Sequence, residues 1–239
     1  MRILSVDTSS NVATVSVTDD EKLVCEILVN TKKTHSQTLM PMIDSALKQA
    51  ELEISDIDLI VSANGPGSFT GLRIGVSAVK GLAHALDIPV VGVSILEAMA
   101  YNLPFCEYIV SPILDARRDQ VYNAVYEWND GEIKEICEPR ALSVDDLIDE
   151  LLGLDKKVVF LGDGVSVHKE YIKEKMGEKA LFAPVSANEQ RASGLAAAAK
   201  KLYDEGKTIS CYELAPIYLR KPQAEREAEE RERMEKEQC

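Results

Sequence analysis

The hydrophobic and polar positions of the first 63 residues predict a small unit of strands and one helix. Residues 3–7, 12–17 and 23–29 have the apolar or alternating pattern of strands, and residues 59–63 form a short apolar run. Within residues 36–50 the apolar positions recur every three or four residues, which is the spacing of one helical face. This stretch therefore predicts three strands, a helix and a fourth strand.

The same order of elements recurs about 108 residues further along the chain, and Asp7 and Asp115 occupy the same place in the two sets. The second set comprises strands over residues 108–115, 121–126, 132–137 and 158–161 and a helix over residues 144–152. Ser143 is the expected N-cap of that helix. Two such units in tandem predict an α/β protein with two similar domains, each a mixed sheet covered by helices.

The expected domains are residues 1–101, which we expect to bind a partner, and a smaller second domain of residues 102–222. The sequence leaves open whether the last helices pack back on the first domain. Residues 223–239 form a charged tail with Glu and Lys or Arg four residues apart, which predicts a solvated helix or a frayed end.

The charge of the chain bears on its partners. Its 239 residues carry 27 Lys and Arg against 40 Asp and Glu, which gives a net charge of -13. Phosphate binding needs clustered basic side chains, so this balance argues against the chain holding nucleic acid by itself.

The five cysteines include no Cys-x-x-Cys pair, and their odd number favours a reducing compartment. No basic-then-apolar segment opens the chain, and no apolar run approaches the roughly 20 residues that span a bilayer. We therefore expect a cytoplasmic protein without membrane contact.

The tandem arrangement resembles the actin, hexokinase and chaperone ATPase (ASKHA) superfamily. In that superfamily the turns after the first strand of each domain hold nucleotide phosphates. The resemblance implies a vestigial nucleotide cleft at Asp7, Thr8, Ser9, Asp115, Gly162, Asp163 and Gly164. The same residue types are common in ordinary loops and turns, so the residues alone leave nucleotide binding open.

A glycine-rich segment, residues 64–75, lies between a predicted strand and a helix that runs to about Leu86. It lacks the Lys followed by Ser or Thr of a phosphate-binding loop. Together with residues 114–118 and 216–225, this segment resembles the family of TsaB and its catalytic paralogue TsaD. Three separated motifs in the expected order make the resemblance specific.

In TsaD a segment after the next strand holds the active-site metal with two histidines four residues apart. The matching positions here are Ile95 and Met99, and neither side chain can supply the imidazole nitrogen that such a site needs. His35, His84 and His168 have no metal-ligand spacing, and we expect surface or helix-capping roles for them. The sequence therefore predicts no catalytic residues, no metal and no cofactor of its own.

The resemblance implies a non-catalytic subunit that acts with TsaD and TsaE in threonylcarbamoyl transfer to the anticodon-adjacent adenosine of tRNA. It implies a heterodimer with TsaD, a homodimer when the chain is alone, and contact with tRNA only through the complex. ATP or ADP and a metal are then expected on TsaD and TsaE. The alternatives are a small-molecule kinase of the same superfamily, a metallopeptidase, or a scaffold for an unrelated partner.

The helices over residues 36–50 and 69–86 are the candidate contact with TsaD. The expected interface residues are Met40, Ile43, Leu47, Leu72, Gly75, Val76, Val79 and Leu86. The alternative is that these apolar faces only cover the chain's own sheet.

Overall fold

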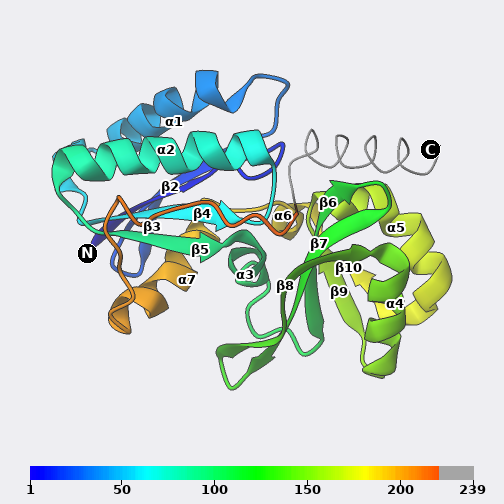
Figure 1. Cartoon of the computed structure of the whole chain (residues 1–239). Coiled ribbons are helices and arrows are strands. Elements are labelled where there is room, and N and C mark those ends of the chain that lie inside the picture. Colours follow the sequence, from blue (N-terminus) through cyan, green and yellow to red (C-terminus); the bar gives the residue numbers. More distant parts are fainter. Residues whose placement is uncertain (221–239) are drawn as a thin grey trace, which may run out of the picture.

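A computed structural model describes residues 1–220, which form two five-stranded mixed sheets with helices against them (Figure 1). The first sheet has the order β3-β2-β1-β4-β5. Its strands are β1 (Arg2–Asp7), β2 (Ala13–Asp19), β3 (Lys22–Val29), β4 (Leu59–Gly65) and β5 (Val90–Ser94). β1 is antiparallel to β2 and parallel to β4.

Helices cover both faces of the first sheet. α1 (His35–Gln49) and α2 (Phe69–Leu86) lie side by side on one face, and α7 (Ala192–Asp204) packs on the other face (Figure 1). Ser68 caps α2, because its hydroxyl accepts a hydrogen bond from the backbone N–H of Gly71 at 3.2 Å. α7, the last long helix within residues 1–220, thus packs on the first domain. The sequence left open whether it would.

The second sheet repeats the topology of the first, with the order β10-β9-β6-β7-β8. Its elements are β6 (Ile109–Arg117), β7 (Gln120–Asn129), β8 (Glu132–Ser143), β9 (Val158–Leu161), β10 (Ala180–Phe182), α4 (Val144–Gly153) and α5 (Asp163–Met176). Ser143 caps α4 as predicted, accepting from the N–H of Asp146 at 3.0 Å. The predicted pair of mixed sheets covered by helices is confirmed.

The two domains share a continuous apolar core. α3 (Ile95–Ala100) is largely buried between them and packs against β6, β7 and α7. Two short 3-10 helices (Ile54–Asp56 and Gly177–Lys179) and α6 (Val185–Asn188) complete the described elements. Because Leu96 and Met99 belong to this shared core, α3 fixes the inner junction of the two domains.

Gly162 is the N-cap of α5, and Asp163 and Gly164 lie in its first turn. One expectation needs correction. His168 is buried on the inner face of α5, whereas a surface or capping role was expected. The predicted tail, residues 223–239, lies outside the described residues.

No helix within residues 1–220 is both long and apolar enough to cross a membrane. The cysteines described by the structure, Cys25, Cys106, Cys137 and Cys211, are free thiols.

Candidate functional site

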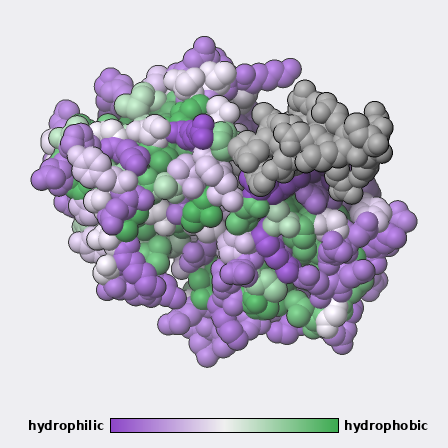
Figure 2. All heavy atoms as spheres, viewed as in Figure 1, coloured by the Kyte–Doolittle hydropathy of each residue, from purple (hydrophilic) through white to green (hydrophobic). Residues whose placement is uncertain are grey.

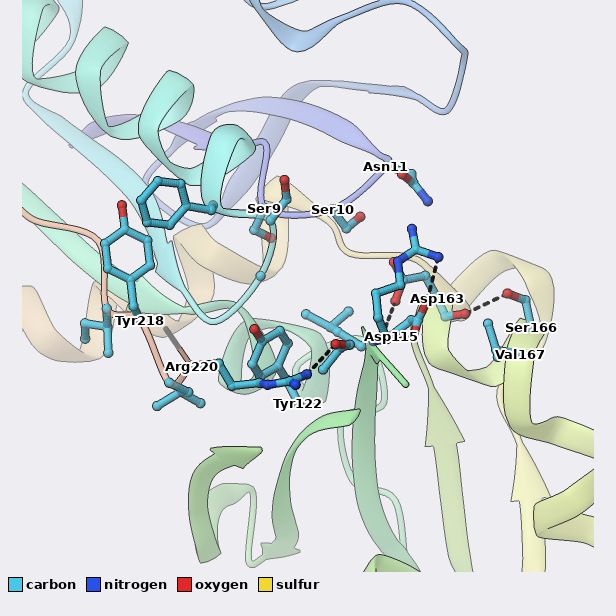
Figure 3. A pocket seen from close by; sticks show the side chains of 18 residues that line it. Ser9, Ser10, Asn11, Asp115, Tyr122, Asp163, Ser166, Val167, Tyr218 and Arg220 are labelled. Atoms are coloured by element: carbon cyan, nitrogen blue, oxygen red, sulfur yellow. Dashed lines mark hydrogen bonds and ion pairs between the residues drawn. The ribbon is translucent and has the colours of Figure 1, made fainter. Parts of the chain in front are cut away.

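A cavity of about 530 Å³ lies where the two domains face each other (Figure 3). Its size is within the usual range for small-molecule sites. The three sequence motifs that carry the family resemblance converge on it, since Gly67–Phe69, Leu114–Arg117 with Tyr122, and Ile217–Arg220 all line its walls. Residues more than 150 positions apart in the sequence thus build one site.

The first-domain wall is formed by the β1–β2 loop and the glycine-rich loop before α2. The backbone N–H of Ser68 donates to the carbonyl oxygen of Ser9 at 2.6 Å. A Cβ atom on Gly67 would lie 2.2 Å from that same oxygen, so only glycine permits this close approach. The glycine-rich loop consequently packs against the backbone of the β1–β2 loop at Ser9.

Two polar groups of the β1–β2 loop, the Ser9 N–H and the Thr8 hydroxyl, donate hydrogen bonds within the protein. The N–H of Ser9 donates to Asp7 at 2.7 Å, and the hydroxyl of Thr8 donates to the carbonyl oxygen of Gly71 at 2.7 Å. Asp7 is fully buried, and loss of solvation raises its pKa to about 6. A phosphate at this loop would therefore find the Ser9 N–H already occupied.

The second-domain wall carries opposite charges. Asp163 accepts a hydrogen bond from the N–H of Asp115 at 2.9 Å, and Arg117 pairs with the Asp115 carboxylate at 3.0 Å. Burial raises the pKa of Asp163 to about 6, although the hydrogen bond from Asp115 opposes this shift. The turn from β6 to β7 is strained, because Arg117, Arg118 and Asp119 all have positive φ angles.

The third wall is the chain after α7, which runs along α2 to the cavity (Figures 1 and 3). Tyr218 stacks on Phe69 with ring centroids 4.6 Å apart, and Arg73 donates to the Tyr218 hydroxyl at 3.1 Å. Arg220 donates to the carbonyl oxygen of Ala116 in the second domain. The motif at residues 216–225 thus reaches both domains within its described part.

Residues 188–191 link the domains on the inner side of the cavity. The N–H of Gly162 in the second domain donates to the backbone carbonyl oxygen of Asn188 at 2.8 Å. Gln190 is fully buried and donates to the Ser10 hydroxyl in the first domain. The sequence showed no signal for Gln190, because a lone Gln between two helices belongs to no motif.

Of the seven predicted cleft residues, the structure brings Ser9, Asp115 and Asp163 to the cavity wall. The other four are buried behind it and do not line it: Asp7, Thr8, Gly162 and Gly164. Sequence reasoning missed Asn11, Ser166 and Val167 as lining residues.

The chemistry of the described wall is that of a polar binding surface. It presents serine hydroxyls, two carboxylates and the guanidinium groups of Arg117 and Arg220, and the described lining contains no His, Cys or Lys. These groups can hydrogen-bond to or pair with a polar ligand or a peptide segment.

Six of the eight predicted interface residues on α1 and α2 are buried within the first domain. Met40 is 48% exposed and Leu86 is half-buried. The remaining six residues are buried in the first domain: Ile43, Leu47, Leu72, Gly75, Val76 and Val79. They cover the chain's own sheet, because the strongest apolar face of each helix packs there.

A different stripe of α2 faces solvent. Its half-buried or exposed members are Ile74, Ser77, Ala78, Gly81 and Ala85, which recur at helical spacing and include no charged residue. Figure 2 shows hydrophobic atoms among hydrophilic ones over α1 and α2, at the upper left of the molecule. An uncharged stripe on a solvent-facing helix is unusual in a chain with net charge -13.

The positions that match the TsaD metal ligands lie on α3. Ile95 and Met99 are both 0% exposed and pack in the core that the two domains share. No group of three potential metal-ligating side chains occurs among residues 1–220.

Known proteins resemble the chain over nearly its whole length. The profile of a family described as "TsaD: tRNA N6-adenosine threonylcarbamoyltransferase" matches residues 24–228. The tRNA threonylcarbamoyladenosine biosynthesis protein TsaB of Bacillus subtilis is 36% identical, covering 94% of this chain and 96% of that protein.

Solved structures show the same fold. YeaZ from Pseudomonas aeruginosa has a TM-score of 0.73 at 28% identity, covering 91% of this chain and 99% of that one. A chain of the PilM-PilN type IV pilus biogenesis complex has a TM-score of 0.51 at 9% identity, covering 83% of this chain and 98% of that one. The second likeness concerns the fold alone.

The duplicated sheets and the cavity between them define a two-domain protein of the actin/hexokinase-like (ASKHA) class. Within that class, the chain belongs to the TsaB family of tRNA threonylcarbamoyladenosine biosynthesis proteins.

Proposed function

We propose that the chain is a non-catalytic subunit required with TsaD and TsaE for threonylcarbamoyl transfer to the anticodon-adjacent adenosine of tRNA. The observation that carries this proposal is the buried, apolar character of Ile95 and Met99 at the positions of the TsaD metal ligands. The names of the Bacillus subtilis and Escherichia coli relatives, which are biosynthesis proteins for this nucleoside, support the same pathway.

The chain needs no cofactor of its own in this proposal, and ATP or ADP and the metal belong to TsaD and TsaE. The first-domain wall supports this division. The N–H of Ser9 is bonded to Asp7, and the carbonyl oxygen of Ser9 accepts from the Ser68 N–H of the glycine-rich loop. A metal-nucleotide complex would have to displace both contacts.

The docking surface for TsaD is the solvent-facing stripe of α2 together with Met40 on α1. A Cβ atom added at Gly81 would have no other atom within 4 Å, so a partner helix can approach this position closely. Small residues permit such close helix contacts, and Met adapts to a partner's shape. The same stripe would form the two-fold contact of a homodimer when TsaD is absent.

Contact with tRNA comes through the complex. The whole chain carries a net charge of -13, which repels a polyanion. TsaD and TsaE must therefore supply most of the phosphate contacts.

Analytical ultracentrifugation of the chain mixed with TsaD tests this proposal. We expect a species with the mass of one chain plus one TsaD. Independent sedimentation of the two proteins at micromolar concentrations would contradict it. Tight ATP binding by the isolated chain would instead favour a small-molecule kinase.

A further inference from the structure

The segment between α7 and the end of the described chain, residues 209–220, is here named the C-terminal strap. Its root, residues 209–214, is firmly anchored in the first domain. Ile209 and Val90 exchange two backbone hydrogen bonds of 2.9 and 3.0 Å, and Leu214 is only 1% exposed. Lys80 adds hydrogen bonds to the carbonyl oxygens of Tyr212 and Leu214.

The tip of the strap, residues 217–220, is held differently. Ile217 is 53% exposed and Tyr218 is 38% exposed, whereas Leu219 is half-buried. The contacts of the tip include the Ile217 N–H bond to Asn64 at 2.6 Å, the Tyr218 contacts with α2, and the Arg220 bond to Ala116. Such contacts are individually weak in water.

The seat of the tip is shaped for it. A Cβ atom on Gly65 would lie 2.4 Å from the carbonyl oxygen of Ile217, and Gly65 has a φ of +134°. Any other residue would therefore be strained there and would push the tip away. The backbone of the strap thus lies close to the backbone of Gly65 at the C-terminal end of β4.

The far contact of the tip is next to strained backbone. Ala116, which accepts from Arg220, directly precedes the three residues with positive φ in the β6–β7 turn. Strained turns of this kind persist only while their surroundings hold them, and they often mark segments that change conformation. Arg220 therefore joins the tip to strained backbone in the second domain.

We propose that residues 217–220 form a releasable strap, which is one wall of the cavity in this structure and widens the cavity when the tip leaves its seat. Release of the tip frees Phe69, the carbonyl oxygen of Asn64 and the carbonyl oxygen of Ala116, while the root stays in place. Access to the cavity is then set by the strap and not by rotation of the domains, since α3 and the shared core hold the inner junction. This inference does not depend on the proposed function.

Amide hydrogen exchange of the full chain, measured by NMR, tests the proposal without a substitution. A tip that opens independently of the root gives an Ile217 amide that exchanges at least about tenfold faster than the Ile209 amide. Equal exchange rates of the two amides would overturn the proposal, because root and tip would then open only together.

A pair of variants tests the effect on the cavity. The double substitution Tyr218→Ala and Arg220→Ala removes the tip contacts, and Tyr212→Ala on the exposed part of the root is the matched control. We expect exchange of the Ser68 amide to rise at least about fivefold in the double variant and to stay unchanged in the control. Unchanged exchange in the double variant would overturn the proposal.

Discussion

Glu26 on β3 accepts a hydrogen bond from Arg191 at 2.9 Å, although the two residues lie 165 positions apart in the chain. The other carboxylate oxygen of Glu26 accepts from the backbone N–H of Ser193 at 2.9 Å. The Glu26 side chain is only 7% exposed. One buried carboxylate therefore fixes the start of α7 on the first sheet.

Glu26→Ala should lower the free energy of unfolding by about 2 kcal/mol, because it leaves the Ser193 N–H and the half-buried Arg191 without their partner. Urea unfolding monitored by circular dichroism measures this. The control is Asp204→Ala, which removes a surface pair with Lys200 and should cost less than about 0.5 kcal/mol. Similar losses in both variants would show that the Glu26 contact does not hold α7.

The raised pKa of Asp7 predicts that the stability of the fold depends on pH. Its folded-state pKa of about 6 is above the ordinary value, so the unfolded chain ionises first as the pH rises from 4 to 6. Wild-type stability should therefore fall across this window relative to Asp7→Asn, by up to roughly 3 kcal/mol, and then stay level above it.

Denaturant unfolding of both proteins at about pH 4.5 and about pH 7.5, values that span most of that window, checks this. Asp149→Asn on the exposed side of α4 is the control and should give the same difference at both values. If the difference for Asp7→Asn also stays constant, Asp7 is ionised throughout and the burial argument fails.

Substitutions at Gly81 test partner binding separately from folding. Because no atom lies near its outward position, Gly81→Ala should raise the free energy of unfolding by up to about 1 kcal/mol through helix propensity. Gly81→Arg should also fold, yet it places a large charged side chain on the α2 stripe and should abolish binding to TsaD. Substitutions at Val76 or Val79 would not serve, since both side chains are buried in the core.

Sedimentation of each Gly81 variant with TsaD measures the second effect, after thermal unfolding has shown that both variants are folded. Normal complex formation by Gly81→Arg would place the TsaD contact elsewhere on the chain.

Much of the fold follows from local patterns. The alternation in β2, the apolar spacing of α1 and the Ser143 cap of α4 are properties of neighbouring residues, and the structure has each of them. α5 was missed because its buried face includes His168, a polar residue that interrupts the apolar spacing of Val165, Ile172 and Met176.

The site was less predictable than the fold. The apolar face of a helix has the same pattern whether it covers the chain's own sheet or a partner, so Ile43 and Val76 could not be assigned from spacing. The stacking of Tyr218 on Phe69 joins residues that are 149 positions apart in the chain. Such a pairing leaves no trace in a single sequence.

Reconstitution of tRNA modification tests the proposed function most directly. Unmodified tRNA is incubated with ATP, threonine, bicarbonate, the adenylate-forming enzyme, TsaD and TsaE, with and without the chain, and threonylcarbamoyladenosine is measured by mass spectrometry. We predict product only when the chain is added to the complete mixture, and none from the chain in place of TsaD. Equal product without the chain would contradict its role as a required subunit, and product without TsaD would contradict its lack of catalytic activity.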